Sequence, residues 1–218
     1  MPVPTPRLAF KQPEALCRTY VYRWGGCLLG TSVTETAIMA GLNLTRSGSA
    51  LDLYRQDHAH ATKTKAYATP GGISGVTQIT DEYSFAGYEI VHRKDFTSTN
   101  DANHQVRDKL RKAFDKTHRQ QVFALSIHYE YPHNHRTSGH SVGFFYSRGG
   151  IGARKPGGRF FDPNVGSWQF SGGDKLLDFY YDEWLPNFLA GTVNPDPGHK
   201  PGRARELRYF RVVGLMKS

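Results

Sequence analysis

The sequence has only two cysteines, Cys17 and Cys27, in 218 residues. A disulfide scaffold needs several bridges, and a bridge between these two would close only a small loop, so we expect free thiols. No stretch approaches the roughly 20 apolar residues of a membrane helix, so we do not expect an integral membrane protein. Residues 1–7 lack the apolar segment of an ordinary secretory signal. We therefore expect a cytoplasmic protein or export by another route.

The sequence also lacks any run of five basic residues, although 28 Lys and Arg against 19 Asp and Glu give a formal charge of +9. The basic residues are spread over 93–119, 148–159 and 200–211. Because nucleic-acid binding needs a concentrated positive footprint, we do not expect a nucleic-acid partner. The charge favours an acidic partner or an anionic membrane surface instead.

Aromatic residues are abundant, with 13 Phe, 12 Tyr and 3 Trp, and this composition predicts a folded chain with a substantial core. Four prolines within residues 1–16 predict an irregular or flexible amino-terminal segment. The length fits one domain, which we expect to span residues 17–218.

Hydrophobic periodicity predicts helices in the first half of the chain and strands mainly in the second. The expected helices are 27–44, 49–58, 102–118 and 174–190, and the expected strands are 122–131, 140–147, 159–162 and 206–215. Residues 59–88 give no clear pattern. This order predicts an α+β fold, with the helical part packed on an antiparallel sheet.

Cys27 is the first candidate for chemistry. It follows Gly25-Gly26, a pair typical of turns, and the helical pattern begins at this cysteine. Unpaired backbone N–H groups and the helix dipole favour a thiolate at a helix N-terminus. The alternative is that Cys27 is a small buried apolar residue. Cys17 is a rival nucleophile, but no Gly turn precedes it.

A cysteine nucleophile needs a base and a group that orients the base. His140 begins an apolar strand next to Gly139, and Asp162 ends the following strand. The alternatives are an ordinary strand-end histidine and an aspartate that forms a turn before Pro163. Taken together, the three residues predict a nucleophile on a helix that faces a hairpin carrying the base and the acid.

Three blocks that contain these residues resemble the catalytic blocks of the YopT/AvrPphB cysteine proteases. They are Gly25-Gly-Cys-Leu-Leu-Gly-Thr-Ser32, Ser138-Gly-His-Ser-Val-Gly-Phe-Phe145 and Phe160-Phe-Asp-Pro-Asn-Val-Gly166. The third block is the most specific. The resemblance implies a papain-like fold and a secreted bacterial effector or toxin domain that cleaves a protein of a host or competitor cell, without a cofactor. It makes Cys27 the nucleophile, His140 the base and Asp162 the acid.

The oxyanion of such an enzyme needs a second donor besides the backbone N–H of the nucleophile. Papain-like enzymes commonly supply a Gln a few residues before the cysteine, but Gln12 lies fifteen residues before Cys27. We therefore consider Arg23 and the Trp24 indole. Trp168 and Trp184 are expected to be packing residues, and Trp168 follows Asp162 closely enough to shield the His–Asp pair.

Other functions are compatible with the same residues. Glutamine deamidation and transglutamination use the same kind of triad, and a non-catalytic basic module that binds nucleic acid or anionic membrane is the alternative from another class. His133-x-His135 has a spacing that suits metal chelation, but no Cys or Glu pair accompanies it at a familiar spacing. We therefore expect solvated loop histidines and no metal.

Overall fold

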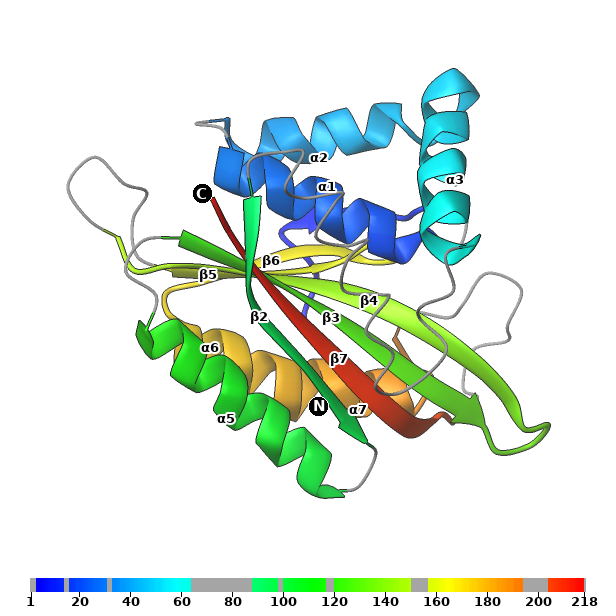
Figure 1. The fold of residues 1–218 in the computed structure, drawn as a ribbon, viewed down its shortest axis with the longest axis vertical. Helices are drawn as coiled ribbons and strands as arrows, with labels where there is room; N and C mark the ends of the chain where they lie inside the picture. The colour runs from blue at the N-terminus through cyan, green and yellow to red at the C-terminus, as the bar shows by residue number, and fades with distance from the viewer. Residues whose placement is uncertain are drawn as a thin grey trace.

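The fold is α+β, with antiparallel strands between two groups of helices (Figure 1). The computed structural model describes residues 3–13, 16–30, 33–63, 88–97, 100–116, 120–149, 157–193 and 204–217. Within them, seven strands form one sheet in the order β1-β6-β5-β4-β3-β7-β2. The strands are β1 (Leu8–Ala9), β2 (Tyr88–Thr97), β3 (Gln120–Tyr131), β4 (Arg136–Ser147), β5 (Gly157–Asp162), β6 (Gly166–Phe170) and β7 (Glu206–Lys217).

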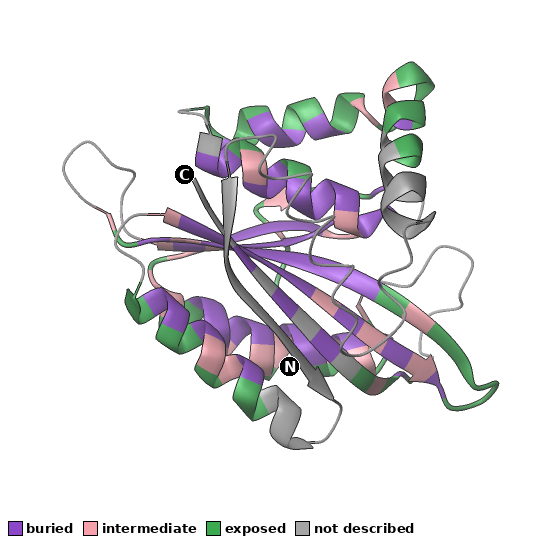
Figure 2. Cartoon of the chain, in the orientation of Figure 1, coloured by how far each residue is buried: buried purple, intermediate pink, exposed green. Residues whose placement is uncertain are grey.

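Helices cover both faces of the sheet. The first face carries α1 (Cys17–Gly30), α2 (Glu35–Leu44) and α3 (Gly48–Lys63), and the second carries α5 (Asn100–Lys116), α6 (Gly173–Asp178), the π-helix η1 (Phe179–Trp184) and α7 (Leu185–Leu189) (Figure 1). Side chains of β3 alternate between two cores: Val122 and Ala124 join the α1 side, and Phe123 and Leu125 the other. The central strands are therefore buried on both faces (Figure 2).

The predicted α+β class is confirmed, as are the four predicted strands, which lie within β3, β4, β5 and β7. The predicted helices 102–118 and 49–58 correspond to α5 and α3. The sequence analysis missed β1, β2 and β6. Gly- and Pro-rich stretches at 69–75, 150–156 and 195–198 also predict loops, and these residues lie outside the described ones. No described helix combines the length and the apolar character that crossing a membrane requires.

The predicted helix 27–44 is wrong at its start. The structure has two helices there, and α1 begins ten residues earlier, at Cys17. Gly25 is not in a turn but inside α1, where an added Cβ would lie 2.6 Å from Val122 Cγ1 on β3. A glycine in a helix costs about 1 kcal/mol relative to alanine, but this one lets the helix approach the sheet.

A second close contact fixes the position of α1 on β4. An added Cβ at Gly143 would lie 2.8 Å from the Trp24 ring, so the bare backbone of β4 accommodates the indole. Trp24 is fully buried and stacks on Phe161, with ring centroids 5.2 Å apart. These glycines therefore serve helix–sheet packing and hold the start of α1 near the ends of β4 and β5.

The amino-terminal segment, expected to be irregular or flexible, is ordered in its described part. Leu8 and Ala9 form β1 and pair with β6, and Phe10 is buried in the core. The Trp168 indole donates to the Pro4 carbonyl oxygen at 2.9 Å. This segment therefore belongs to the folded domain.

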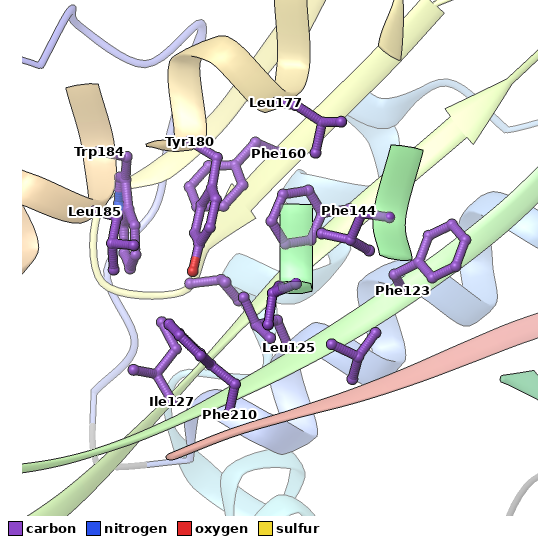
Figure 3. Close-up of a cluster of buried hydrophobic side chains, with 14 of the residues drawn as sticks. Phe123, Leu125, Ile127, Phe144, Phe160, Leu177, Tyr180, Trp184, Leu185 and Phe210 are labelled. Atoms are coloured by element: carbon purple, nitrogen blue, oxygen red, sulfur yellow. The ribbon is translucent and has the colours of Figure 1, made fainter. Parts of the chain in front are cut away.

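The predicted helix 174–190 forms as α6, η1 and α7 in succession. Its irregular middle part, η1, directly precedes the turn that contains Pro186, which lacks a backbone N–H. Tyr180 and Trp184 of η1 lie in the aromatic core beside Phe160 (Figure 3). The π-helix thus brings Trp184 to the carboxyl end of β5.

Candidate active site

His140 and Asp162 lie side by side on β4 and β5, as predicted. His140 Nε2 is 3.0 Å from Asp162 Oδ1, and the side chains are 2% and 0% exposed. Because β4 and β5 pair antiparallel, residues 22 positions apart meet at the same end of the hairpin. A buried carboxylate on this nitrogen fixes the tautomer and the orientation of the imidazole.

Asp162 is held by two further donors. The backbone N–H of Asn164 donates to Oδ1 at 2.9 Å, and the Trp184 indole N–H donates to Oδ2 at 3.1 Å. A buried carboxylate is costly unless hydrogen bonds compensate it. The three donors together hold this carboxyl group in place beside His140.

Aromatic rings cover the histidine. Trp184 and Phe188 stack on the imidazole, with ring centroids 6.2 and 5.6 Å away. The rings that cover His140 are thus Phe188 and Trp184, and Trp184 had been expected only to pack. Trp168 packs on Phe160 and donates to the Pro4 carbonyl instead.

The thiol that contacts this pair is Cys17, the first residue of α1, which is buried. Its sulfur is hydrogen-bonded to His140 and receives a backbone hydrogen bond from Ser141. Since Nε2 of His140 is bonded to Asp162, Nδ1 is the nitrogen that remains for the sulfur. The three side chains form a chain in the order Cys17, His140, Asp162.

The electrostatics of this chain favour an ion pair. Burial raises the pKa of the Cys17 thiol, but the hydrogen bond and charge of His140, with hydrogen bonds from Ser141, bring it below the ordinary 9.0. Burial lowers the pKa of His140, but Asp162 and Cys17 outweigh this effect and raise it to about 10. Both shifts act toward a thiolate beside an imidazolium, the reactive form of a cysteine nucleophile.

The structure does not bring Cys27 to the pair. Cys27 lies ten residues after Cys17 on the same helix, about 15 Å further along the axis. The residue as a whole is exposed, but partial burial of its sulfur raises its pKa despite the nearby Arg23 guanidinium. The cysteine brought to His140 and Asp162 is the rival that the sequence analysis had ranked below it.

A helical pattern in the sequence could have identified Cys17. Tyr20, Val21, Trp24 and Leu28 follow it at helical spacing and are all fully buried. This stripe has residue 17 at its centre, on the face that packs against the sheet, whereas residue 27 falls at its edge. Because Gly25-Gly26 was interpreted as a turn, the helical pattern on its two sides was not seen as one helix.

Neither predicted oxyanion donor lies at the pair. The Trp24 indole N–H donates to Glu35 Oε1 at 3.2 Å, deep in the α1–sheet interface. Glu35 also accepts from Ser167 at 2.5 Å and pairs with Arg159 at 2.9 Å, so this cluster joins α1 and α2 to β5 and β6. Arg23 is exposed and lies by Cys27.

Gln12 is the residue whose significance the sequence analysis missed. It lies five residues before Cys17, is 3% exposed, and donates from Nε2 to Asn164 Oδ1 at 2.6 Å. Counting from Cys27 had placed this glutamine too far away. Counted from Cys17, it has the short spacing that the sequence analysis sought for an oxyanion donor.

The histidines considered for a metal site lie on the β3–β4 hairpin. His135 Nδ1 is 2.8 Å from Glu130 Oε1, and its ring is 85% exposed. Among the residues that the structure describes, no group of three or more His, Cys, Asp and Glu side chains could hold a metal ion.

Comparison of the chain with models of protein families finds no match, and comparison with curated proteins finds no match either.

Proposed function

We propose that this protein is a thiol hydrolase with a Cys-His-Asp triad formed by Cys17, His140 and Asp162. The observation that carries the proposal is the buried chain of hydrogen bonds from the Cys17 sulfur through His140 to Asp162. Cys17 replaces Cys27 in the role that the sequence analysis assigned. A cysteine at a helix N-terminus facing His and Asp on strands is also the arrangement expected of a papain-like fold, which we include in the proposal.

The reaction begins when the Cys17 thiolate attacks a carbonyl carbon of the substrate. The carbonyl electron pair moves to oxygen, and donors placed at that oxygen stabilise the tetrahedral oxyanion. We assign this role to the backbone N–H of Cys17 and the side-chain N–H of Gln12. The intermediate then collapses and expels the leaving group, which takes the proton of the His140 imidazolium, and a thioester remains on Cys17.

Hydrolysis of the thioester completes the cycle. Neutral His140 accepts a proton from water at Nδ1 as the water oxygen attacks the thioester carbonyl. Collapse of the second tetrahedral intermediate breaks the carbon–sulfur bond, releases the carboxylic acid and restores the thiolate–imidazolium pair. Asp162 keeps the imidazole oriented through both steps.

We propose a peptide bond as the bond that is cleaved. The support is the resemblance of the blocks around His140 and Asp162 to the YopT/AvrPphB proteases, since Cys27 no longer contributes to it. The same resemblance is the support for a protein substrate in a host or competitor cell and for delivery by a specialised bacterial secretion system.

The proposal is tested with two reagents on the folded chain. Iodoacetamide alkylates reactive thiolates, and p-nitrophenyl acetate acylates a nucleophile through a tetrahedral intermediate. We expect both to modify Cys17, with Cys17→Ala lowering the acylation burst at least ~1000-fold. Cys27→Ala is the matched control and should acylate at the wild-type rate. Equal bursts in the two variants would overturn the assignment of Cys17.

The bond is identified with a peptide library prepared from a digested proteome. A protease creates new amino termini, whereas a deamidase converts glutamine to glutamate without cutting the chain. We expect new termini with the wild-type protein and none with Cys17→Ala. Converted glutamines without new termini would replace the protease by the deamidase that the sequence analysis kept as an alternative.

A further inference from the structure

Asn164 lies in the turn between β5 and β6 and contacts two parts of the candidate site. Its backbone N–H donates to Asp162 Oδ1 at 2.9 Å. Its side-chain Oδ1 accepts from Gln12 Nε2 at 2.6 Å. The turn itself is closed by a hydrogen bond from the Val165 N–H to the Asp162 carbonyl oxygen at 3.0 Å. One residue therefore joins the acid of the triad to the segment that precedes the nucleophile.

Gln12 is attached to this turn by its backbone as well. Its backbone N–H donates to the Pro163 carbonyl oxygen at 2.7 Å, and the neighbouring Phe10 N–H donates to Val165 at 3.1 Å. The backbone contacts fix where the glutamine lies. They do not fix which end of its carboxamide carries the nitrogen, and in the structure Nε2 is the end that meets Asn164 Oδ1.

The orientation matters because the two ends of a carboxamide have opposite effects on an oxyanion. The amide nitrogen has two hydrogens. Asn164 Oδ1 accepts one of them, and the second is the hydrogen that an oxyanion donor needs. A rotated amide would present Oε1 instead, and two oxygens carrying negative charge would repel each other.

We propose that Asn164 is a positioning residue that orients the Gln12 carboxamide as an oxyanion donor. The inference rests on the proposed function, since it names how one part of that site is held. Asn164 acts through Gln12, and its own side chain makes no contact with the reacting atoms in this account.

A double-mutant cycle of Gln12→Ala and Asn164→Ala tests the inference, with p-nitrophenyl acetate acylation as the readout. Loss of one oxyanion donor costs about 100- to 1000-fold. We expect Gln12→Ala to lower acylation by about 100-fold and Asn164→Ala by about 10- to 100-fold. The double variant should match Gln12→Ala, because Asn164 has nothing left to orient. If the loss in the double variant instead equalled the product of the two single losses, the inference would be overturned.

Iodoacetamide separates this role from an effect through Asp162. Alkylation is a direct displacement that builds no oxyanion, whereas it depends on the thiolate that His140 and Asp162 maintain. Because alanine keeps the backbone N–H that Asp162 accepts, we expect alkylation of Cys17 in Asn164→Ala to stay within about 2-fold of wild type. A fall in alkylation as large as the fall in acylation would show that Asn164 acts on the triad instead.

Two further variants keep the result interpretable. Asn164→Asp retains an acceptor oxygen for Gln12 Nε2 and should acylate faster than Asn164→Ala, and an equal or slower rate would overturn the acceptor role. Asn134→Ala is the matched control, because Asn134 Oδ1 also holds a turn, by accepting from the Arg136 N–H at 3.1 Å. It should acylate like wild type. If wild-type Cys17 neither acylates nor alkylates faster than Cys27, the proposed function fails rather than this inference alone.

Discussion

Helix α1 carries both cysteines of the protein, and its two ends place them in opposite environments. Cys17 is the first residue of the helix, buried, with His140 and Ser141 at its sulfur. Cys27 lies in the last turn, exposed, with Arg23 as the charge that favours its thiolate. The pKa of the first thiol is lowered and that of the second is raised.

The two ends of α1 differ in the contributions that lower a thiol pKa. The helix dipole favours a negative charge at residue 17 and disfavours it at residue 27. One nearby arginine does not compensate for the burial of the Cys27 sulfur. The difference between the ends therefore comes from the helix dipole together with His140 and Ser141, which the sheet presents only at Cys17.

The largest effect on this comparison should come from His140→Ala. The variant removes the hydrogen bond and the charge that lower the Cys17 pKa, so that burial then raises it. We expect alkylation of Cys17 by iodoacetamide at pH 7 to fall by about 100-fold, because a buried thiol without the imidazole forms little thiolate.

The pH dependence of alkylation shows whether the pKa of each cysteine is raised or lowered. In the wild type the thiolate of Cys17 forms as the pH rises through a pKa below 9.0, and the imidazolium beside it persists until about pH 10. Alkylation of Cys17 should therefore rise at a lower pH than that of Cys27, measured in the same sample by mass spectrometry. In His140→Ala, alkylation of Cys17 should no longer rise at a lower pH than alkylation of Cys27. Coincident profiles in the wild type would contradict the ion pair.

The sequence predicted two residues of the candidate site, His140 and Asp162, and it favoured Cys27 over the cysteine that the structure brings to them, for a physical reason. His140 and Asp162 lie on strands whose alternation is local, so their positions at the hairpin end follow from periodicity. The start of α1 depends on tertiary contact, because Gly25 is tolerated inside the helix only through its approach to Val122. Gln12 could be considered as an oxyanion donor only once Cys17 was the candidate nucleophile, because the argument depends on the short spacing between the two residues.

The sequence predicted the aromatic residues of the core but not the hydrogen bonds that they make. Trp184 was expected to pack, and it packs, but the π-helix also turns its indole N–H toward Asp162. Nothing in the local sequence distinguishes a π-helix from the α-helix that periodicity predicts. Strand β1 could not be predicted either, because it has only two residues and forms by pairing with the edge of β6.

A smaller effect is expected from Trp184→Phe, which keeps a ring over His140 and removes one of the three donors to Asp162. Hydrogen bonds to charged groups contribute about 1.5–3 kcal/mol. We expect the free energy of unfolding to fall by about 2 kcal/mol and alkylation of Cys17 to slow several-fold. Urea unfolding and iodoacetamide kinetics measure the two.

Trp168→Phe is the matched control for that variant. Its indole donates to the Pro4 carbonyl, a neutral group remote from the triad in the hydrogen-bond network. We expect it to cost about 1 kcal/mol of stability and to leave the alkylation of Cys17 unchanged. If both variants slowed alkylation equally, the contrast between the helix ends would not depend on the hydrogen bond to Asp162.

The smallest effect should come from Gly25→Ala, which disturbs the helix that both cysteines share without touching either sulfur. Alanine gains about 1 kcal/mol in helix propensity, but its Cβ would lie 2.6 Å from Val122 Cγ1, and overpacking costs about 1–3 kcal/mol. We expect a net loss of about 1 kcal/mol in urea unfolding. Gly41→Ala in α2 meets nothing within 4 Å and should instead gain about 0.5–1 kcal/mol. The substitution Val122→Ala should remove the clash with the new Cβ. If Gly25→Ala still lowers stability in a Val122→Ala protein, the loss does not come from this contact.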